Sequence, residues 1–333
     1  MEKLCDICDF QGGSQPPKEE WSFEKLDGYV RMLQIRDFTQ SERAVPEYIK
    51  ISSSTKLCEE DDILIARYGA SLGKILTGLA GAYNVAIMKI IPDTSKVLKR
   101  YLYYYLKSNY FQMSILNVGS RAAQAGFNKE DLAKLDINCP SIDEQRKIVD
   151  VLDNIEQILL YEKQQLADLD ILIKARFVEM FGDIHAPSKW EKKPWSELVT
   201  IQNGRDYKNI LVESGGYPVY GTGGEMARAS EYLCPENTII VGRKGTINNP
   251  LLVKEKFWNV DTAFGVIVGN QLHYQYFYNF CRMFDFSTLN KQAVLPSTTK
   301  ADLLKIEMAV PPMELQNQFA TFVEQTDKSK FVA

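Results

Sequence analysis

The chain of 333 residues contains one unit twice, and this duplication limits the folds open to it. Residues 127–145 read FNKEDLAKLDINCPSIDEQ and residues 299–316 read TKADLLKIEMAVPPMELQ, with identities recurring at one constant offset. Farther upstream, DILIARYG at 62–69 matches TIIVGRKG at 238–245. Several matches that keep their order and near-constant spacing indicate a true internal repeat, so we expect two domains with the same fold.

Both units have the same expected order of elements. Short alternating strands, punctuated by Gly, Pro and Asn turns, occupy most of each unit. An aromatic helical stretch follows at 97–116 and at 272–284, and we interpret it as a helix packed on the strands. A proline then precedes a second helix. The predicted parts are two α+β domains at 1–140 and 184–311, a long helix at 141–183 and a shorter C-terminal helix at 312–333.

The helix after the first unit is predicted to be long, because no helix breaker occurs from Ile142 to Phe181 and Gly182 stands where a C-terminal cap belongs. Forty residues at 1.5 Å each would make a rod of roughly 60 Å. Its apolar residues recur in steps of four and three, which is typical of a coiled-coil seam. These residues, called the apolar seam below, are Ile148, Leu152, Ile155, Leu159, Leu166, Leu169, Ile173 and Met180.

The charge of the chain is unevenly distributed. Residues 141–183 hold ten acidic and five basic side chains, so this segment accounts for the net charge of −4 and the remainder is nearly neutral. Bulk charge therefore cannot hold a polyanion, and any DNA contact must use local basic loops. Cys5 and Cys8 form a CxxC without further ligands at matching spacing, so we expect reduced thiols and no metal site. No apolar run approaches the ~20 residues that cross a bilayer, and MEKLCDICDF has no signal core, so we expect a cytoplasmic protein.

The duplicated phrases and the long helix resemble those of the specificity subunits of type I restriction-modification systems. The resemblance covers essentially the whole chain. It rests on VRMLQIRDF in the first unit, YPVYGTGGEMARA at 217–229 in the second, the hydrophobic-Arg-x-Gly loop in both, and above all on the exits LDINCPSIDEQRKIVDVLDNIEQIL and IEMAVPPMELQNQFATFVEQTD. Singly each phrase is weak, but together and in order they are specific.

The resemblance implies two target-recognition domains separated by a long coiled-coil helix, with an antiparallel second helix. Each domain would read one half of a bipartite, asymmetric site on double-stranded DNA. Two modification subunits that bind S-adenosylmethionine would dock on the chain, and restriction (motor) subunits that use ATP and Mg would join them, so the chain itself needs no cofactor. The second helix of this chain is only about 20 residues by the repeat. Either the form is shortened, or a partner or second copy supplies the missing segment.

Base edges are read by bidentate donors such as Arg, Asn and Gln, whereas Lys, Arg and small hydroxyls hold phosphates. Most candidates lie in four loops, RYGASLGK and GSRAAQAGFNK of the first unit and GRKGTINN and LNKQAVLPSTTK of the second. Three more lie near the YGTGG turn of the second unit, and Arg36 lies in the VRMLQIRDF segment of the first. Arg67 and Arg243 could instead pair with internal carboxylates. The predicted DNA-binding residues are Arg36, Arg67, Tyr68, Ser71, Lys74, Arg121, Gln124, Tyr220, Thr222, Arg228, Arg243, Lys244, Thr246, Asn290, Lys291, Gln292 and Ser297.

Catalytic motifs have little support in the sequence. GASLGK is one residue short of a phosphate-binding loop, and Ile75 stands where that loop needs Ser or Thr. The chain has no methyltransferase tetrad, no GxGxxG that opens a βαβ unit and no HExxH. We therefore predict a binding subunit without catalytic residues. The alternatives are a self-contained methyltransferase or nuclease, for which no stretch remains to house a core, and an adaptor that binds protein instead of DNA.

Overall fold

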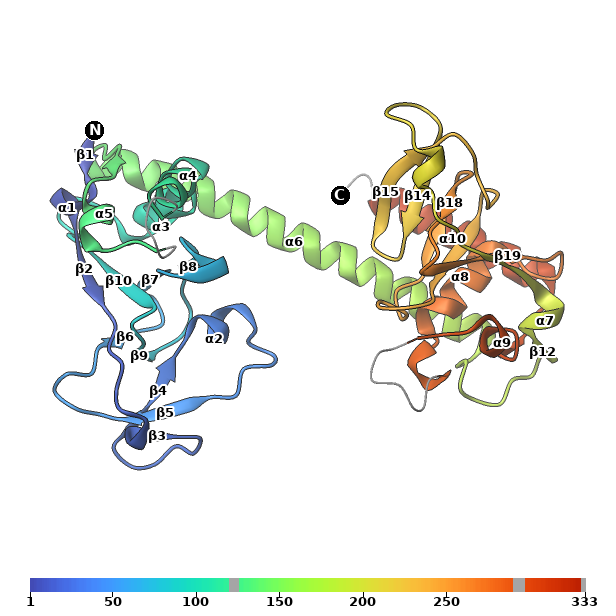
Figure 1. The fold of residues 1–333 in the computed structure, drawn as a ribbon, viewed down its shortest axis with the longest axis horizontal. Helices are drawn as coiled ribbons and strands as arrows, with labels where there is room; N and C mark the ends of the chain where they lie inside the picture. The colour runs from blue at the N-terminus through green and yellow to red at the C-terminus, as the bar shows by residue number, and fades with distance from the viewer. Residues whose placement is uncertain (120–125, 290–296, 331–333) are drawn as a thin grey trace. The chain divides into compact units, whose positions relative to one another are not determined.

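The computed structural model describes residues 1–119, 126–289 and 297–330. The chain divides into two compact units, Met1–Leu159 (unit one) and Leu160–Ala333 (unit two). Each unit combines small β-sheets with helices, as Figure 1 shows. The predicted α+β class is confirmed, and so is the presence of two similar domains. The four-stranded sheets of the two domains have the same strand topology.

Unit one is built on two sheets and a short terminal ribbon. The four-stranded sheet is entirely antiparallel and has the order β2-β10-β7-β8. The five-stranded sheet has the order β3-β5-β4-β9-β6, and its β4–β9 pair is parallel. The bounds are β1 Glu2–Lys3, β2 Cys8–Gly12, β3 Trp21–Ser22, β4 Tyr29–Leu33, β5 Glu47–Lys50, β6 Leu57–Cys58, β7 Ile63–Ala66, β8 Ile75–Leu76, β9 Gly81–Tyr83, β10 Ile87–Pro92 and β11 Asp136–Ile137.

The core of unit one lies between the four-stranded sheet and two helices. Strand β7 reads ILIA and is buried at every position, as expected for a central strand that is covered on both faces. Helices α3 (Lys99–Lys107) and α4 (Asn109–Gly119) contribute Leu102, Leu106 and Phe111, which have no exposed surface. The aromatic stretch predicted as a packing helix therefore serves the core, although a break at Ser108 divides it into two helices.

Unit two repeats this plan. Its four-stranded sheet has the order β13-β19-β16-β17, its three-stranded sheet the order β15-β14-β18, and the β14–β18 pair is again parallel. Trp195 of the short helix α7 (Trp195–Leu198) packs on Phe277 of α8 (Tyr274–Met283) in an aromatic core. The strand bounds are β12 Lys192–Pro194, β13 Val199–Asn203, β14 Tyr217–Gly221, β15 Gly224–Ala229, β16 Thr238–Gly242, β17 Leu251–Val253, β18 Trp258–Asn259, β19 Ala263–Val268 and β20 Glu307–Ala309.

Helix α6 (Ile142–Phe181) has 40 residues and covers the stretch that has no helix breaker in the sequence. The Ser141 hydroxyl donates to the Glu144 carboxylate at 2.6 Å in the first turn. Gly182 ends the helix with a φ of 86°, a left-handed conformation that costs glycine little. Residues 142–159 of the helix belong to unit one, and residues 160–181 belong to unit two.

The C-terminal helix α10 (Met313–Lys330) packs on the end of α6 within unit two. Phe319 meets the rings of Phe177 and Phe181 edge-on, both at 5.5 Å between centroids. The Lys330 ammonium lies 2.7 Å from the Asp170 carboxylate. Because the later residue of α10 meets the earlier residue of α6, the two helices are antiparallel. The shorter antiparallel C-terminal helix that we predicted is confirmed.

Candidate nucleic-acid interface

In unit one, the first of the two loops singled out in the sequence lies beside Gly126, which belongs to the second. Residues 67–74 (the Arg67 loop) leave β7 and return as β8. Tyr68 forms an isolated antiparallel bridge with Gly126, at the end of the second predicted loop. A Cβ atom at Gly126 would lie 2.5 Å from the Tyr68 ring, so this close approach requires glycine. Tyr68 and Lys74 are exposed at this surface, whereas Ser71 is half-buried.

The guanidinium of Arg67 connects three segments of unit one. Its Nε donates to the Phe127 carbonyl at 3.3 Å, and its Nη1 donates to the Val85 carbonyl at 3.2 Å. The guanidinium also stacks over the Tyr68 ring at 5.0 Å from the centroid. In this structure Arg67 thus contacts backbone carbonyls and a ring, where the sequence had suggested either a base or a carboxylate. Arg67 fixes the shape of the loop that carries Tyr68 and Lys74.

Unit two builds the same arrangement around residues 242–249 (the Arg243 loop). Arg243 Nη1 donates to the Asp261 carbonyl at 3.5 Å, at the place where Arg67 contacts Val85 in unit one. Lys244 forms a bridge with Ser297, and the Thr298 hydroxyl donates to the Gly242 carbonyl at 2.7 Å. Arg243, Lys244 and Thr246 are exposed. The duplication therefore repeats the pairing of the two loops as well as the strands beneath them.

The remaining described candidates lie on β14, in the β14–β15 turn and on β15 in unit two, and after β4 in unit one. In unit two, a Cβ atom at Gly242 would lie 3.2 Å from the methyl carbon of Thr222. The β14–β15 turn therefore borders the Arg243 loop. Arg228 Nε pairs with Glu225 at 2.9 Å. Tyr220 packs edge-on against Phe257 at 5.7 Å, and burial raises the pKa of its hydroxyl. Predicted residues outside the described part of the chain are Arg121, Gln124, Asn290, Lys291 and Gln292.

In unit one, Arg36 lies on the short helix α2 (Ile35–Thr39), which follows β4. It forms an ion pair with Glu47 of β5, and the Gln34 amide donates to the same carboxylate oxygen at 2.5 Å. Sequence patterns offered no reason to select Gln34, two residues before Arg36, or Glu47, which reaches Arg36 only through the pairing of β4 with β5.

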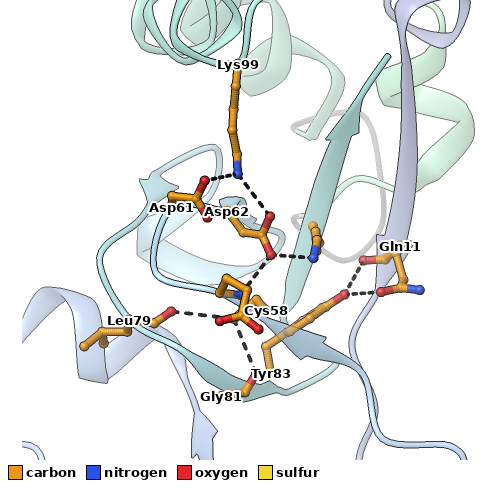
Figure 2. Close-up of polar contacts among 10 residues, drawn as sticks. Gln11, Cys58, Asp61, Asp62, Leu79, Gly81, Tyr83 and Lys99 are labelled. Atoms are coloured by element: carbon orange, nitrogen blue, oxygen red, sulfur yellow. Dashed lines mark hydrogen bonds and ion pairs between the residues drawn. The ribbon is translucent and has the colours of Figure 1, made fainter. Parts of the chain in front are cut away.

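Polar contacts tie strands and a helix of unit one to one another, and Figure 2 shows them together. The buried Tyr83 hydroxyl donates to the Gln11 side-chain oxygen at 2.8 Å, and burial raises its pKa. The Lys99 ammonium contacts the carboxylates of Asp61 at 2.8 Å and Asp62 at 3.3 Å. These contacts join β9 to β2, and the start of α3 to the turn before β7.

In each unit, a buried glutamine ties one helix, α6 or α10, to the rest of that unit. Gln145 has no exposed surface; its Oε1 accepts the Leu98 N–H at 2.8 Å, and its Nε2 donates to the Pro140 carbonyl at 2.8 Å. Gln316 repeats this with the His273 N–H at 2.8 Å and the Pro311 carbonyl at 2.8 Å. The sequence repeat shows glutamine at both equivalent positions, but this identity did not reveal the structural role of the two side chains.

Two further findings concern the described residues only. Among them, no helix is long and apolar enough to span a membrane. The described ranges also contain no group of three or more His, Cys, Asp or Glu side chains that could hold a metal ion. Of the two CxxC cysteines, Cys5 is exposed and Cys8 is buried.

The fold and its two loop pairs define a class, a duplicated α+β protein that presents one equivalent polar surface per unit. The family model described as the type I restriction modification DNA specificity domain matches residues 1–170 and 187–331. The chain therefore belongs to the family of type I restriction-modification DNA specificity domains. The predicted specificity subunit is confirmed at this level, and with it a non-catalytic protein, because specificity subunits are the non-catalytic members of these systems.

Curated relatives and solved structures agree with this assignment. The MjaVIII and MjaIX specificity subunits of Methanocaldococcus jannaschii are 24% identical over 203 residues and 25% identical over 255 residues. These matches cover 56% and 66% of this chain, but 46% and 56% of the relatives, so the chain spans about half the length of the curated relatives it matches. The S subunit from M. genitalium has a similar fold, with a TM-score of 0.58 at 15% identity over 99% of this chain and 89% of that one. A chain from a structure of type I complex assembly and conformational transition gives a TM-score of 0.57, also at 15% identity, over 99% and 90%.

Proposed function

We propose that the chain binds a bipartite, asymmetric site on double-stranded DNA, with each unit reading one half-site. The observation that carries this proposal is the repeated pairing of an Arg-x-Gly loop with a second loop, at Tyr68–Gly126 and at Lys244–Ser297. Two equivalent surfaces on one chain suit a target with two half-sites. The loops differ in sequence, RYGASLGK against GRKGTINN, so the two half-sites should differ as well.

The charge distribution supports contacts through these loops. The Arg67 loop contains Arg67 and Lys74 and no acidic residue, whereas the helix α6 is strongly acidic. DNA carries one negative charge per ~1.7 Å of its axis, so it is attracted to the loops and repelled by the helix. A net charge of −4 leaves little bulk attraction, and partner subunits would then supply part of the affinity.

The exposed part of α6 is a suitable docking surface for those partners. Ile155 and Leu159, both in the apolar seam, are 48% and 56% exposed in their unit. A contiguous exposed apolar surface usually marks a protein interaction site. In our proposal, two modification subunits that carry S-adenosylmethionine dock on the chain, and restriction subunits that use ATP and Mg join the complex in the cytoplasm.

The decisive experiment is a map of methylated adenine in cells with and without this gene, with the neighbouring modification gene present in both. The proposal predicts that one gapped, asymmetric motif is methylated only when the gene is present. A methylome that does not change on deletion contradicts the proposal. Binding of the purified complex that is insensitive to salt would favour the protein-binding adaptor instead, because counterion release makes DNA binding steeply salt-dependent.

A further inference from the structure

The two units share their framework but differ where the chain leaves the central parallel strand. Strand β4 pairs with β9 through Met32–Ala82, and β14 pairs with β18 through Val219–Trp258, so both strands occupy the same place in their sheets. After β4 the chain enters helix α2, whereas after β14 it makes a tight turn into β15. Two domains that perform one task on different targets are expected to differ at the surface that reads the target.

In unit one, a buried carboxylate fixes the start of α2. Asp37 is only 3% exposed; it accepts the Gln34 backbone N–H at 2.8 Å and the Arg31 guanidinium at 2.9 Å. The backbone at Gln34 is therefore held in one position, and the side chains of Gln34 and Arg36 leave it in defined directions.

A second carboxylate holds those two side chains. Glu47 lies on β5, beside β4, and its Oε2 receives both the Gln34 amide and the Arg36 guanidinium. The side chain of Glu47 is 19% exposed, but that of Arg36 is 48% exposed. One nitrogen of the guanidinium, Nη2, is thus engaged, and the other N–H groups remain available to a ligand. Preorganised donors of this kind lose little conformational entropy on binding.

These residues line a groove of about 440 Å³ in unit one. Its lining also includes Lys18, an exposed cation that suits a phosphate, and the aromatic side chain of Trp21. Glu47 is the one acidic residue of the lining, and Arg36 neutralises it. The groove therefore offers a fixed bidentate donor beside a cation, which matches a base edge and its neighbouring phosphate.

We propose that Arg36 is a specificity-determining residue of unit one that donates two hydrogen bonds to O6 and N7 of a guanine, while Glu47 and Gln34 position it. Guanine is the base whose major-groove edge accepts such a fork. This inference rests on the proposed function, because it assigns one position of the first half-site. If Arg36 were only part of a surface ion pair, its removal would leave the recognised sequence unchanged.

The test uses the complex of the full chain with its modification subunits. In cells, the methylated motif is mapped. With the purified complex, binding is measured to duplexes that vary at each half-site position. Arg36→Ala is compared with Arg36→Lys, which keeps the charge but lacks the fork, and with Glu47→Gln. Arg43→Ala, an exposed arginine after α2 that does not line the groove, is the charge-matched control. Thermal unfolding confirms that each variant is folded.

The expected result is that both Arg36 variants lose about tenfold to a hundredfold discrimination at a single guanine of one half-site, while every other position is still read. Glu47→Gln should weaken the same position less, and Arg43→Ala should keep the motif. An unchanged motif in both Arg36 variants, or a uniform loss of affinity for all sequences, overturns the assignment of Arg36. Either result leaves the proposed function standing. A wild-type complex that recognises no gapped motif overturns the proposed function and this inference together.

Discussion

The buried amides of Gln145 and Gln316 bear on how the proposed recognition surfaces are held. Each accepts one backbone N–H and donates to carbonyls of two separate segments, so each satisfies groups that would otherwise be buried without partners. The segments are the turn before the aromatic helix and the proline that precedes the following helix. One side chain per unit thereby sets where α6 and α10 begin.

Replacing Gln145 with Ala should lower the free energy of unfolding by about 1–3 kcal/mol, because the Leu98 N–H and the carbonyls of Lys96 and Pro140 lose their partner. Gln316→Ala should cost about the same. Urea unfolding measures both, with Gln157→Ala, an exposed glutamine on α6, as the matched control. If Gln145→Ala unfolds like that control, the amide is not a structural anchor.

Lys74 lies at the end of the Arg67 loop and is exposed, so a phosphate is its expected contact. Lys74→Ala should weaken binding to all DNA sequences about equally and reduce the slope of log affinity against log salt by about 1. Lys163→Ala, an exposed lysine of the acidic helix, should leave the slope unchanged. Titrations of the purified complex at several salt concentrations measure both slopes, and equal slopes for the two variants would remove Lys74 from the interface.

At the scale of the element, charged contacts join the first half of α6 to α3 in unit one. Arg100 Nε donates to Asp153 at 2.6 Å, and its Nη2 contacts Glu156 at 2.5 Å. The Tyr104 hydroxyl donates to Asp153 at 2.6 Å and lies in cation–π contact with Arg100. The hydrogen bond from Tyr104, and then the contact with Arg100, hold the pKa of the Asp153 carboxyl below its ordinary value.

The lowered pKa of Asp153 predicts a pH dependence of unfolding. A carboxyl whose pKa is lower in the folded state contributes stability above its unfolded pKa of about 3.9, and this stability is lost as the pH falls through the folded value. The wild type should exceed Asp153→Asn in stability at pH 6, by less than about 1 kcal/mol because the side chain is 44% exposed. The difference should shrink below pH 4. Urea unfolding at both pH values tests this, and a difference that grows on acidification would contradict it.

Half of the apolar seam of α6 is exposed, namely Ile148, Ile155, Leu159 and Leu166, and one substitution can test whether a partner docks there. Ile155→Glu should leave the free energy of unfolding within about 0.5 kcal/mol of wild type, because Ile155 is already exposed, yet prevent stable assembly with modification subunits. Gln157→Glu adds the same charge to an exposed polar position of the same helix and should assemble normally. Native mass spectrometry measures the complexes. Normal assembly of Ile155→Glu would exclude this part of the seam as the docking surface.

At the scale of the whole molecule, the repeat and the helix bounds could be predicted because both are written locally in the sequence. The absence of breakers from Ile142 and the glycine at Gly182 define α6, and the repeat defines two domains of one fold. The seam has one periodicity throughout, so it could not reveal that Ile173 is buried while Ile155 is exposed. That difference depends on α10, which returns from far along the chain.

Sequence patterns singled out the four candidate loops but not their pairing. The structure joins the two loops of each unit through Tyr68–Gly126 and Lys244–Ser297. The contact of Arg67 with the Val85 carbonyl was not expected, because a backbone partner leaves no trace in the sequence. The same holds for Glu47, which reaches Arg36 only through the pairing of β4 with β5. Which residues touch DNA stays a prediction.

The repeated glutamine anchor has a consequence for how such a chain can change over generations. Gln145 and Gln316 bind mostly backbone groups, which every sequence provides, and they lie in segments separate from α2 and the β14–β15 turn. Substitutions that alter one recognition surface therefore leave the seating of the helices intact. Under the proposed function, a lineage could acquire a new target through one unit at a time, while the helix surface proposed to bind partners stays unchanged.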